Sequence, residues 1–301
     1  MSRLLSVLAR LTACLAILAG PFGCASPPSR GQSLIYDSES FRAVLRERVP
    51  ELSDQMVRAP FEISSETLAL ARKHVMASPR GSDRVRALVE FLSNPKPEGL
   101  GLQYDWATSS TAERTLELGR GDCVALATVM VGLGRGLDWP IYFAEARTRR
   151  PETHEFSEIT VLSDHMVVIV VAKTVRMVVD FLGLVGDGYE IHPIDDLTAY
   201  AHLINNVAGR GVISGQAESS EESWAAALDG FMLATRIQPE LGRAWNNLGV
   251  AYTRLGRFDE ARAAYHRAVE LDTVFGSPER NLMIMETRAA GAPTLTESRL
   301  P

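Results

Sequence analysis

The chain has 301 residues, of which 46% are hydrophobic and 23% are charged, and its formal net charge is −6. This length suits one ordinary domain with a smaller one, and the hydrophobic fraction is that of a globular protein rather than a disordered one. The pI is about 5.6 and no basic run is interleaved with aromatic residues. These features argue against a nucleic-acid-binding protein.

The first 23 residues have the pattern of a secretory signal peptide. Arg3 and Arg10 give a positively charged start, and an almost unbroken apolar stretch follows over residues 11–22. This is the order of regions in a secretory signal. The stretch is shorter than the roughly 20 apolar residues that span a bilayer. We therefore expect residues 1–23 to be removed, with a retained membrane anchor as the alternative.

The residues around Cys24 resemble the lipidation site of bacterial lipoproteins. Small residues precede Cys24 and a flexible Ala-Ser-Pro-Pro-Ser run follows it, although Pro21 stands where the motif usually has Leu. Cys14 fits the motif letter by letter, but lipidation there would leave the apolar residues 15–22 on the mature surface. We expect the lipid (palmitate among its chains) on Cys24, with Cys14 or plain secretion as alternatives. The resemblance implies an envelope protein anchored to a bacterial membrane and facing the periplasm.

The cysteine count bears on the chemistry of the chain. The three cysteines are Cys14, Cys24 and Cys123. Removal of the signal and lipidation of Cys24 leave Cys123 as the free thiol, so a disulfide within the mature domain is excluded. A lone cysteine in an exported protein is either an inert core residue or a reactive one.

The order of elements predicts an α+β fold. Helical periodicity dominates the first half, strand-like Val- and Ile-rich runs follow, and helical periodicity returns beyond residue 196. Residues 110–113 have the S/T-x-x-E spacing of a capping box. The predicted helices are 38–49, 65–76, 83–92, 111–118 and 123–133, and the predicted strands are 141–147, 158–162, 165–172 and 175–182.

Cys123 is predicted to lie in the first turn of a helix. Asp122 is a favourable N-cap residue and directly precedes the apolar run 123–133. A helix N-terminus presents unpaired N–H groups and the positive end of the helix dipole. Both favour the thiolate, which is the form that attacks, and the N–H groups could also hold an oxyanion. A buried structural cysteine is the alternative for this residue taken alone.

Among the six histidines, His165 opens a strongly predicted buried strand, and Asp180 lies in the apolar strand that follows. If residues 173–174 form a two-residue hairpin loop, Asp180 lies opposite Val167. His165 and Asp180 then point to the same face of the sheet as diagonal neighbours, because side chains alternate with period two. A carboxylate can reach an imidazole at that separation. The alternative is that the two polar side chains satisfy each other in a purely structural role.

In combination, these parts resemble the transglutaminase-like superfamily, a branch of the papain-like cysteine enzymes. The resemblance covers roughly residues 83–180 and is carried by Gly121-Asp122-Cys123, Asp164-His165 and Val179-Asp180-Phe181. It implies helices packed on an antiparallel sheet. It also implies that Cys123 attacks a carbonyl, that His165 takes and returns the proton, and that Asp180 holds the imidazole tautomer.

The resemblance further implies a protein or peptide substrate for a peptidase, an amidase or a transglutaminase-type acyltransferase. The family usually has an aromatic residue soon after the histidine, where this chain has Met166 and Val167. An oxyanion-hole donor is expected upstream, with Gln103 or Trp106 as candidates. The family uses no organic cofactor for this step. The chain has no EF-hand-like spacing of carboxylates for calcium and no C-x-x-C or H-E-x-x-H motif for zinc.

A repeat with a period of 34 residues appears in the C-terminal part, which is the period of the tetratricopeptide repeat. Ala227, Phe231 and Ala234 recur 34 residues later as Ala261, Tyr265 and Ala268. The later unit resembles a complete repeat between two partial ones. Arrays of this kind bind protein segments in a concave groove, so we expect a protein partner. The complete repeat also carries Trp245, Leu248, Gly249 and Tyr252.

These predictions divide the chain into five parts. A signal peptide over 1–23 and a tether over 24–37 precede a transglutaminase-like domain over 38–205. A tetratricopeptide-repeat region over 218–290 and a tail over 291–301 follow. The predicted function is that of an envelope-anchored cysteine enzyme whose repeats dock a partner or substrate. The alternative is a catalytically idle lipoprotein adaptor that binds a protein partner through the repeats.

Overall fold

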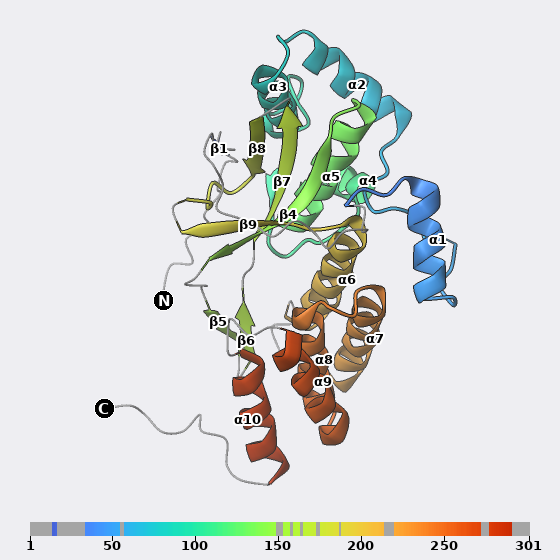
Figure 1. The fold of residues 1–301 in the computed structure, drawn as a ribbon, viewed down its shortest axis with the longest axis vertical. Coiled ribbons are helices and arrows are strands. Elements are labelled where there is room, and N and C mark those ends of the chain that lie inside the picture. The colour runs from blue at the N-terminus through green and yellow to red at the C-terminus, as the bar shows by residue number, and fades with distance from the viewer. Residues whose placement is uncertain are drawn as a thin grey trace. The chain divides into compact units, whose positions relative to one another are not determined.

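The computed structural model combines helices with mainly antiparallel strands, so the fold is mixed α+β, with a helical region near the C-terminus (Figure 1). Cys24, most of the predicted tether and the predicted tail lie outside the described residues. In the described part of the chain, no helix is both long and apolar enough to cross a membrane. The structure describes residues 14–16, 34–54, 57–148, 153–156, 159–162, 165–172, 175–186, 188–213, 220–271 and 277–290.

The chain divides into two compact units that are not consecutive in sequence. The first unit comprises residues 1–34, 60–146 and 165–194, and the second comprises residues 35–59, 147–164 and 195–301. The domain boundaries expected from the sequence, 38–205 and 218–290, therefore cross this division. Each unit has its own sheet or hairpin and its own helices.

The first unit is built on a five-stranded sheet with the strand order β1-β8-β7-β4-β9. The pairs β1–β8, β8–β7 and β7–β4 are antiparallel. The short strand β1 falls inside the segment expected to be a signal peptide. The strands are β1 (Cys14–Ala16), β4 (Ile141–Thr148), β7 (His165–Ala172), β8 (Val175–Asp180) and β9 (Tyr189–Pro193).

Helix α5 (Cys123–Gly136) is the central helix of the first unit and packs against β7 (Figure 1). Every residue from Val124 to Gly134 is buried. A helix that is apolar all round belongs in a core. The other helices of this unit are α2 (Ser65–Met76), α3 (Ser82–Ser93) and α4 (Ala112–Leu118).

One face of the sheet carries an apolar cluster that follows the period of two. Its members come from β4, β7 and β8, and the chain beyond β8 packs on it through Val185, Tyr189 and Ile191. Because side chains alternate along a strand, His165 and Asp180 share this face with Val167 and Val178. The buried members of the cluster are Tyr142, Ala144, Ala146, Val167, Ile169 and Val178.

The second unit is mainly a stack of helices in which each helix from α6 to α10 packs on the next. Buried aromatic residues, among them Trp224, Phe231 and Tyr265, form its core together with Leu248. The helices are α1 (Ser38–Arg48), α6 (Asp196–Ile213), α7 (Glu221–Ile237), α8 (Gly242–Arg254), α9 (Phe258–Leu271) and α10 (Ser277–Ala289).

Helix α1 belongs to the second unit although the C-terminal helices lie far along the chain. It contacts α6 and α7. The Arg48 guanidinium donates to the carbonyl of Ile237, and Arg236 pairs through both of its terminal nitrogens with Glu51, with Nη2 2.9 Å from Oε2. The end of α1 and Glu51 shortly after it are thus fixed to the end of α7.

Strands β5 (Thr153–Phe156) and β6 (Ile159–Leu162) form an antiparallel hairpin in the second unit. Strand β6 lies against α10. Along the chain the hairpin is inserted between β4 and β7, which pair with each other in the sheet of the first unit. The sequence predicted a strand at 158–162 but not its partner at 153–156.

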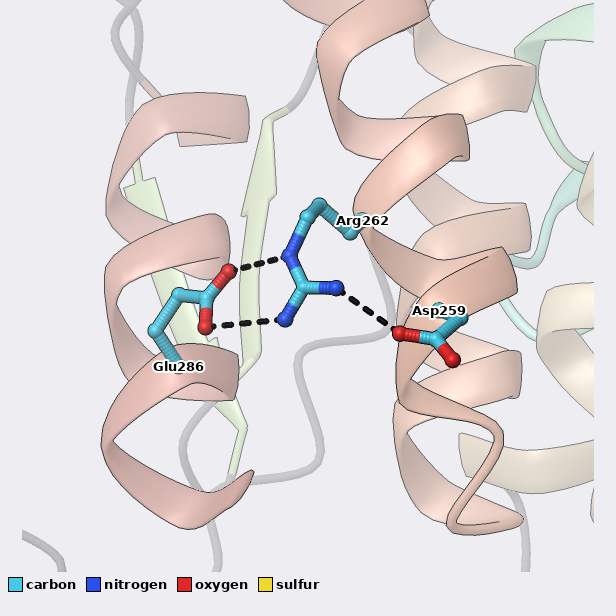
Figure 2. A network of polar contacts seen from close by, with 3 residues as sticks. All are labelled: Asp259, Arg262 and Glu286. Atoms are coloured by element: carbon cyan, nitrogen blue, oxygen red, sulfur yellow. Dashed lines mark hydrogen bonds and ion pairs between the residues drawn. The ribbon is translucent and has the colours of Figure 1, made fainter. Parts of the chain in front are cut away.

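Helix α10 is held on α9 by a network of charged side chains. Figure 2 shows Arg262 between Glu286 and Asp259. Arg262 Nε lies 2.6 Å from Glu286 Oε1, and Nη2 lies 3.1 Å from Oε2, which is a two-point contact. Nη1 lies 2.8 Å from Asp259 Oδ1 within α9. The shared guanidinium therefore fixes the position of α10 along α9.

Candidate active site

Cys123 is the first residue of α5, as the sequence predicted. Asp122 is the N-cap, and its Oδ1 accepts a hydrogen bond of 2.9 Å from the backbone N–H of Ala125. The Cys123 thiol is free and partly exposed, whereas Val124 and the residues after it are buried. A partly exposed thiol at a helix start has access to solvent and to the unpaired N–H groups of the first turn.

A short parallel ladder leads into the nucleophile position. Strands β2 (Gln103–Tyr104) and β3 (Arg120–Gly121) pair with Tyr104 opposite Gly121. The ladder continues through the N–H of Asp105, which donates to the carbonyl of Gly121 at 2.9 Å. The loop after β2 is thereby held beside the start of α5.

The two candidate oxyanion donors lie on this ladder and loop. Gln103 is exposed in β2 opposite Arg120, and Trp106 is 46% exposed in the loop after β2. The Ser109 hydroxyl, near the end of the same loop, donates to Asp122 Oδ2. Asp122 therefore joins the loop to the first turn of α5. Both donors remain candidates.

The capping box expected at residues 110–113 is wrong. The N-cap of α4 is Thr111, whose side chain makes no capping hydrogen bond. Ser110 Oγ instead lies 2.8 Å from Thr115 Oγ1, and Glu113 Oε1 accepts a hydrogen bond of 2.6 Å from the N–H of Ser64. The carboxylate therefore binds a backbone donor at the start of α2 rather than one of its own helix.

His165 and Asp180 meet as the strand register predicted. Strands β7 and β8 pair with Ala172 opposite Val175, which is the register of a two-residue loop. The two side chains lie on one face, with His165 Nε2 2.5 Å from Asp180 Oδ1. His165 is 5% exposed and Asp180 is 1% exposed. The pair is therefore nearly shielded from water.

The Asp180 carboxylate is stabilised as an anion by three hydrogen-bond donors. Besides His165, the N–H of Leu182 donates to Oδ1 at 2.9 Å and the N–H of Val185 donates to Oδ2 at 2.8 Å. Burial raises the pKa of Asp180, but the hydrogen bond and charge of His165 and the two N–H donors outweigh it and lower the pKa to about 2. These two donors could not be predicted from residue type, since every residue except proline supplies a backbone N–H.

Cys123 is among the groups that shift the pKa of His165. Burial lowers the pKa of His165, but the hydrogen bonds of Asp180 and Cys123 and the charges of both partners raise it to about 9. Because Nε2 is bound to Asp180, Nδ1 is the nitrogen that remains for Cys123. The three side chains named by the sequence thus form one connected set within the first unit.

The other described side chains offer no competing metal centre. Within the described residues, no three or more His, Cys, Asp and Glu side chains are grouped so that they could hold a metal ion. His192 in β9 lies 3.6 Å from Glu190 and is about one-third exposed at 36%. Its environment therefore differs from that of His165.

The helices of the second unit have the geometry of a repeat. Helix α8 packs on α9, and Gly249 of α8 faces the ring of Tyr265 of α9 so closely that a Cβ at position 249 would lie 2.6 Å from Cε1. A family model for the tetratricopeptide repeat matches residues 242–272. Residues 242–272 are a tetratricopeptide repeat. No curated protein has significant sequence similarity to the chain.

The tetratricopeptide repeat is tied to its neighbouring helices by a row of asparagines. Asn281 of α10 donates to Asn246 of α8 at 2.9 Å, and Asn247 of α8 donates to Asn205 of α6 at 3.0 Å. A longer contact of 3.4 Å joins Asn246 to Asn247. Helices α6, α8 and α10 therefore share one polar seam. The repeat is accordingly part of a larger helical stack. A single repeat cannot bury its apolar face by itself and needs neighbouring helices to do so.

Proposed function

We propose that the first unit is a papain-like cysteine enzyme of the transglutaminase-like type, acting on a protein or peptide carbonyl. The single observation that carries the proposal is the connected set Cys123–His165–Asp180, with the thiol at a helix start and the imidazole held between thiol and carboxylate. The resemblance of residues 83–180 to that superfamily supports the same conclusion.

The chemistry begins with attack of the Cys123 thiolate on the substrate carbonyl carbon. A C–S bond forms, and the carbonyl oxygen becomes an oxyanion facing the N–H groups of the first turn of α5. As the oxyanion collapses, the C–N bond breaks and Nδ1 of His165 gives its proton to the leaving amine. A thioester remains on Cys123.

The second half of the reaction returns the starting state. Nδ1 of His165 takes a proton from water, which attacks the thioester carbonyl and breaks the C–S bond. A carboxylic acid leaves, and its proton equilibrates with solvent. An amine in place of water gives a new amide, so hydrolysis and acyl transfer differ only in the second nucleophile. Asp180 keeps Nε2 occupied throughout and stabilises the imidazolium.

The second unit supplies the interaction function in this proposal. The tetratricopeptide repeat at 242–272 supports a role in protein–protein interaction. We propose that it docks a protein partner or the substrate. We further propose that residues 1–23 are a signal peptide and that a lipid on Cys24 anchors the protein to a bacterial membrane, facing the periplasm. The n-region, the apolar stretch and the small residues before Cys24 support this.

The test measures how fast iodoacetamide alkylates Cys123 at pH 7, by mass spectrometry of the peptide that contains it. An imidazole-paired thiol reacts as a thiolate, whereas an ordinary thiol is mostly protonated at this pH. We expect His165→Ala to slow labelling by about 30-fold. His192→Ala is the matched control and leaves the rate unchanged. Equal rates in the wild type and His165→Ala would exclude an activated thiol.

Turnover requires a second measurement. Trapping the acyl-enzyme on Cys123 in cells and identifying the attached fragment by mass spectrometry would reveal the substrate. An amide-derived acyl group on Cys123 of the wild type, absent from Cys123→Ala, is the expected result. If alkylation shows an activated thiol but no acyl adduct forms in cells, the site is chemically competent and the proposed turnover is contradicted.

The tetratricopeptide repeat favours one further candidate, an adaptor without catalysis. In that case the partner binds through the helices and the triad is idle. Complementation of a deletion strain separates the two functions. Full rescue by Cys123→Ser favours the adaptor, whereas failure of Cys123→Ser together with rescue by His192→Ala favours the enzyme.

A further inference from the structure

Strand β8 has two sides, and one of them is covered by residues from the start of the chain. Strand β7 pairs with one side. Strand β1 pairs with the other, with Cys14 opposite Asp180, Leu15 opposite Val179 and Ala16 opposite Val178. Among the described strands, β7 and β1 are the two neighbours of β8, and β1 lies at the end of the sheet. Without β1, the backbone of Val178–Asp180 is a free sheet edge.

This edge ends at the candidate active site. The last residue of β8 is Asp180, which binds His165, and Cys123 is among the groups that raise the pKa of His165. Neighbouring strands lie about 4.8 Å apart. A chain paired with β8 at Asp180 therefore runs one strand spacing from the backbone of β8, the strand that carries the orienting carboxylate, and about 10 Å from β7, the strand that carries His165.

The edge is built to be paired. Met177, Val178 and Val179 are apolar and each is 1% exposed, so β8 is a short apolar strand. Free edges of this kind pair with an extended chain unless they are protected. Residues 14–16 of this chain occupy the edge as an antiparallel strand, which shows that the edge accepts one.

We propose that the edge of β8 binds the substrate as an extended peptide, by antiparallel strand addition, and that residues 14–16 occupy this place until residues 1–23 are removed. The proposal rests on the proposed function and on removal of that segment. Main-chain hydrogen bonds supply the affinity in this mode of recognition, so an unfolded or extended segment is favoured over a folded one. Proline is excluded wherever the ladder needs an N–H.

The first test removes β1 without shortening the chain. Leu15→Pro places a residue without an N–H in β1, and Leu5→Pro is the matched control outside it. Backbone hydrogen exchange is measured at Val178, Val179 and Asp180 in the Cys123→Ala background, so that no turnover occurs. We expect exchange at these residues to be about tenfold faster in Leu15→Pro, which is the loss of roughly one net hydrogen bond. Equal exchange in both proline variants would overturn the pairing.

The second test adds a peptide in trans to the Leu15→Pro chain. The probe has the sequence of residues 11–19 with serine at position 14 and a lysine at each end. Its control carries N-methyl groups at alternate residues, which remove ladder hydrogen bonds and keep the side chains. The proposal expects the probe to restore slow exchange at residues 178–180 and the N-methylated peptide to bind at least tenfold more weakly. Equal binding of both peptides, or no effect on exchange, would overturn it.

Failure of this inference is distinguishable from failure of the proposed function. Binding is read in a chain that lacks the thiol, whereas thiol activation is read from alkylation of Cys123 in the wild type. In a Leu15→Pro chain that keeps Cys123, the probe is expected to slow alkylation of Cys123 at least threefold. The reason is that the bound probe lies along the strand edge that leads to the site. Slowing by the N-methylated peptide to the same extent would count against strand addition.

Discussion

His165 presents Nε2 to Asp180, at 2.5 Å from Oδ1, and not Nδ1. The strand register puts the carboxylate diagonally across from the histidine on the same face. The nitrogen nearer the backbone, Nδ1, is left for the thiol at the start of α5. The proton that moves during the proposed reaction is therefore carried by Nδ1, and the proton on Nε2 stays in place.

The titration of His165 tests this arrangement directly. Its pKa is raised from 6.5 to about 9, although burial alone lowers it. We expect the imidazole nitrogen resonances in an NMR titration to change with a midpoint near pH 9. Removing either partner, in Asp180→Ala or Cys123→Ala, removes a cause of the increase and shifts the midpoint to lower pH. A midpoint near 6.5 in the wild type would contradict the paired geometry.

The same shift predicts how stability depends on pH. A histidine whose pKa is higher in the folded state stabilises the fold fully below its unfolded value of 6.5. That contribution is lost as the pH rises through about 9. The free energy of unfolding, measured in urea, is therefore expected to decrease more between pH 6 and pH 9.5 in the wild type than in His165→Gln. The reverse order would contradict the sign.

Asp180→Asn is expected to destabilise the first unit by about 2–4 kcal/mol at pH 7, because a buried ion pair and a backbone hydrogen bond are lost. The pKa of Asp180 is lowered to about 2, so its contribution is complete above 3.8 and disappears as the pH falls through about 2. The difference between wild type and Asp180→Asn in urea unfolding should shrink between pH 4 and pH 2. Asp83→Asn, on the surface of α3, serves as the control.

Two glycines of the second unit predict opposite effects of the same substitution. In Gly249→Ala the new Cβ lies 2.6–2.9 Å from ring atoms of the buried Tyr265. We therefore expect the free energy of unfolding to fall by about 1–3 kcal/mol. In Gly209→Ala, within α6, the Cβ meets no atom within 4 Å, and alanine is the better helix former. The free energy of unfolding of Gly209→Ala is expected to rise by about 0.5–1 kcal/mol. Thermal unfolding followed by circular dichroism measures both.

The network in Figure 2 predicts a local effect. Arg262→Ala removes the contacts to Glu286 and Asp259 at once. Because these side chains are exposed, we expect amide exchange in α10 to rise by only about two- to fivefold, with no change in α5. The effect should vanish in 1 M salt, which screens exposed charges. Arg267→Ala, whose Glu270 partner lies within α9, is the control. A change in amide exchange in α5 would show that the effect of Arg262→Ala is not confined to α10.

The parts of the site that depend on local pattern were predictable from the sequence. Asp122 before an apolar run identified the start of α5, and a two-residue loop fixed the β7–β8 register and hence the meeting of His165 and Asp180. The repeat at 242–272 was readable from its period. Each of these follows from the spacing of residues a few positions apart or from a fixed repeat length.

The parts that depend on distant segments were not predictable. The N–H groups of Leu182 and Val185 stabilise the Asp180 anion, yet backbone donors leave no trace in residue type. Glu113 was expected to cap its own helix but binds Ser64, 49 residues away. The contact of Arg48 with Ile237 joins segments 189 residues apart, and nothing in either segment alone indicates the other.

The interleaving of the two units bears on how this gene can change. The chain passes from one unit to the other after residues 34, 59, 146, 164 and 194. A break in the coding sequence after residue 194 would separate helices α6–α10 from the sheet, but it would leave α1 and the β5–β6 hairpin without the helices of their own unit. Moving residues 195–301 alone to another gene would therefore leave behind two segments that belong to the same unit. One of them, the insertion over 147–164, ends directly before His165.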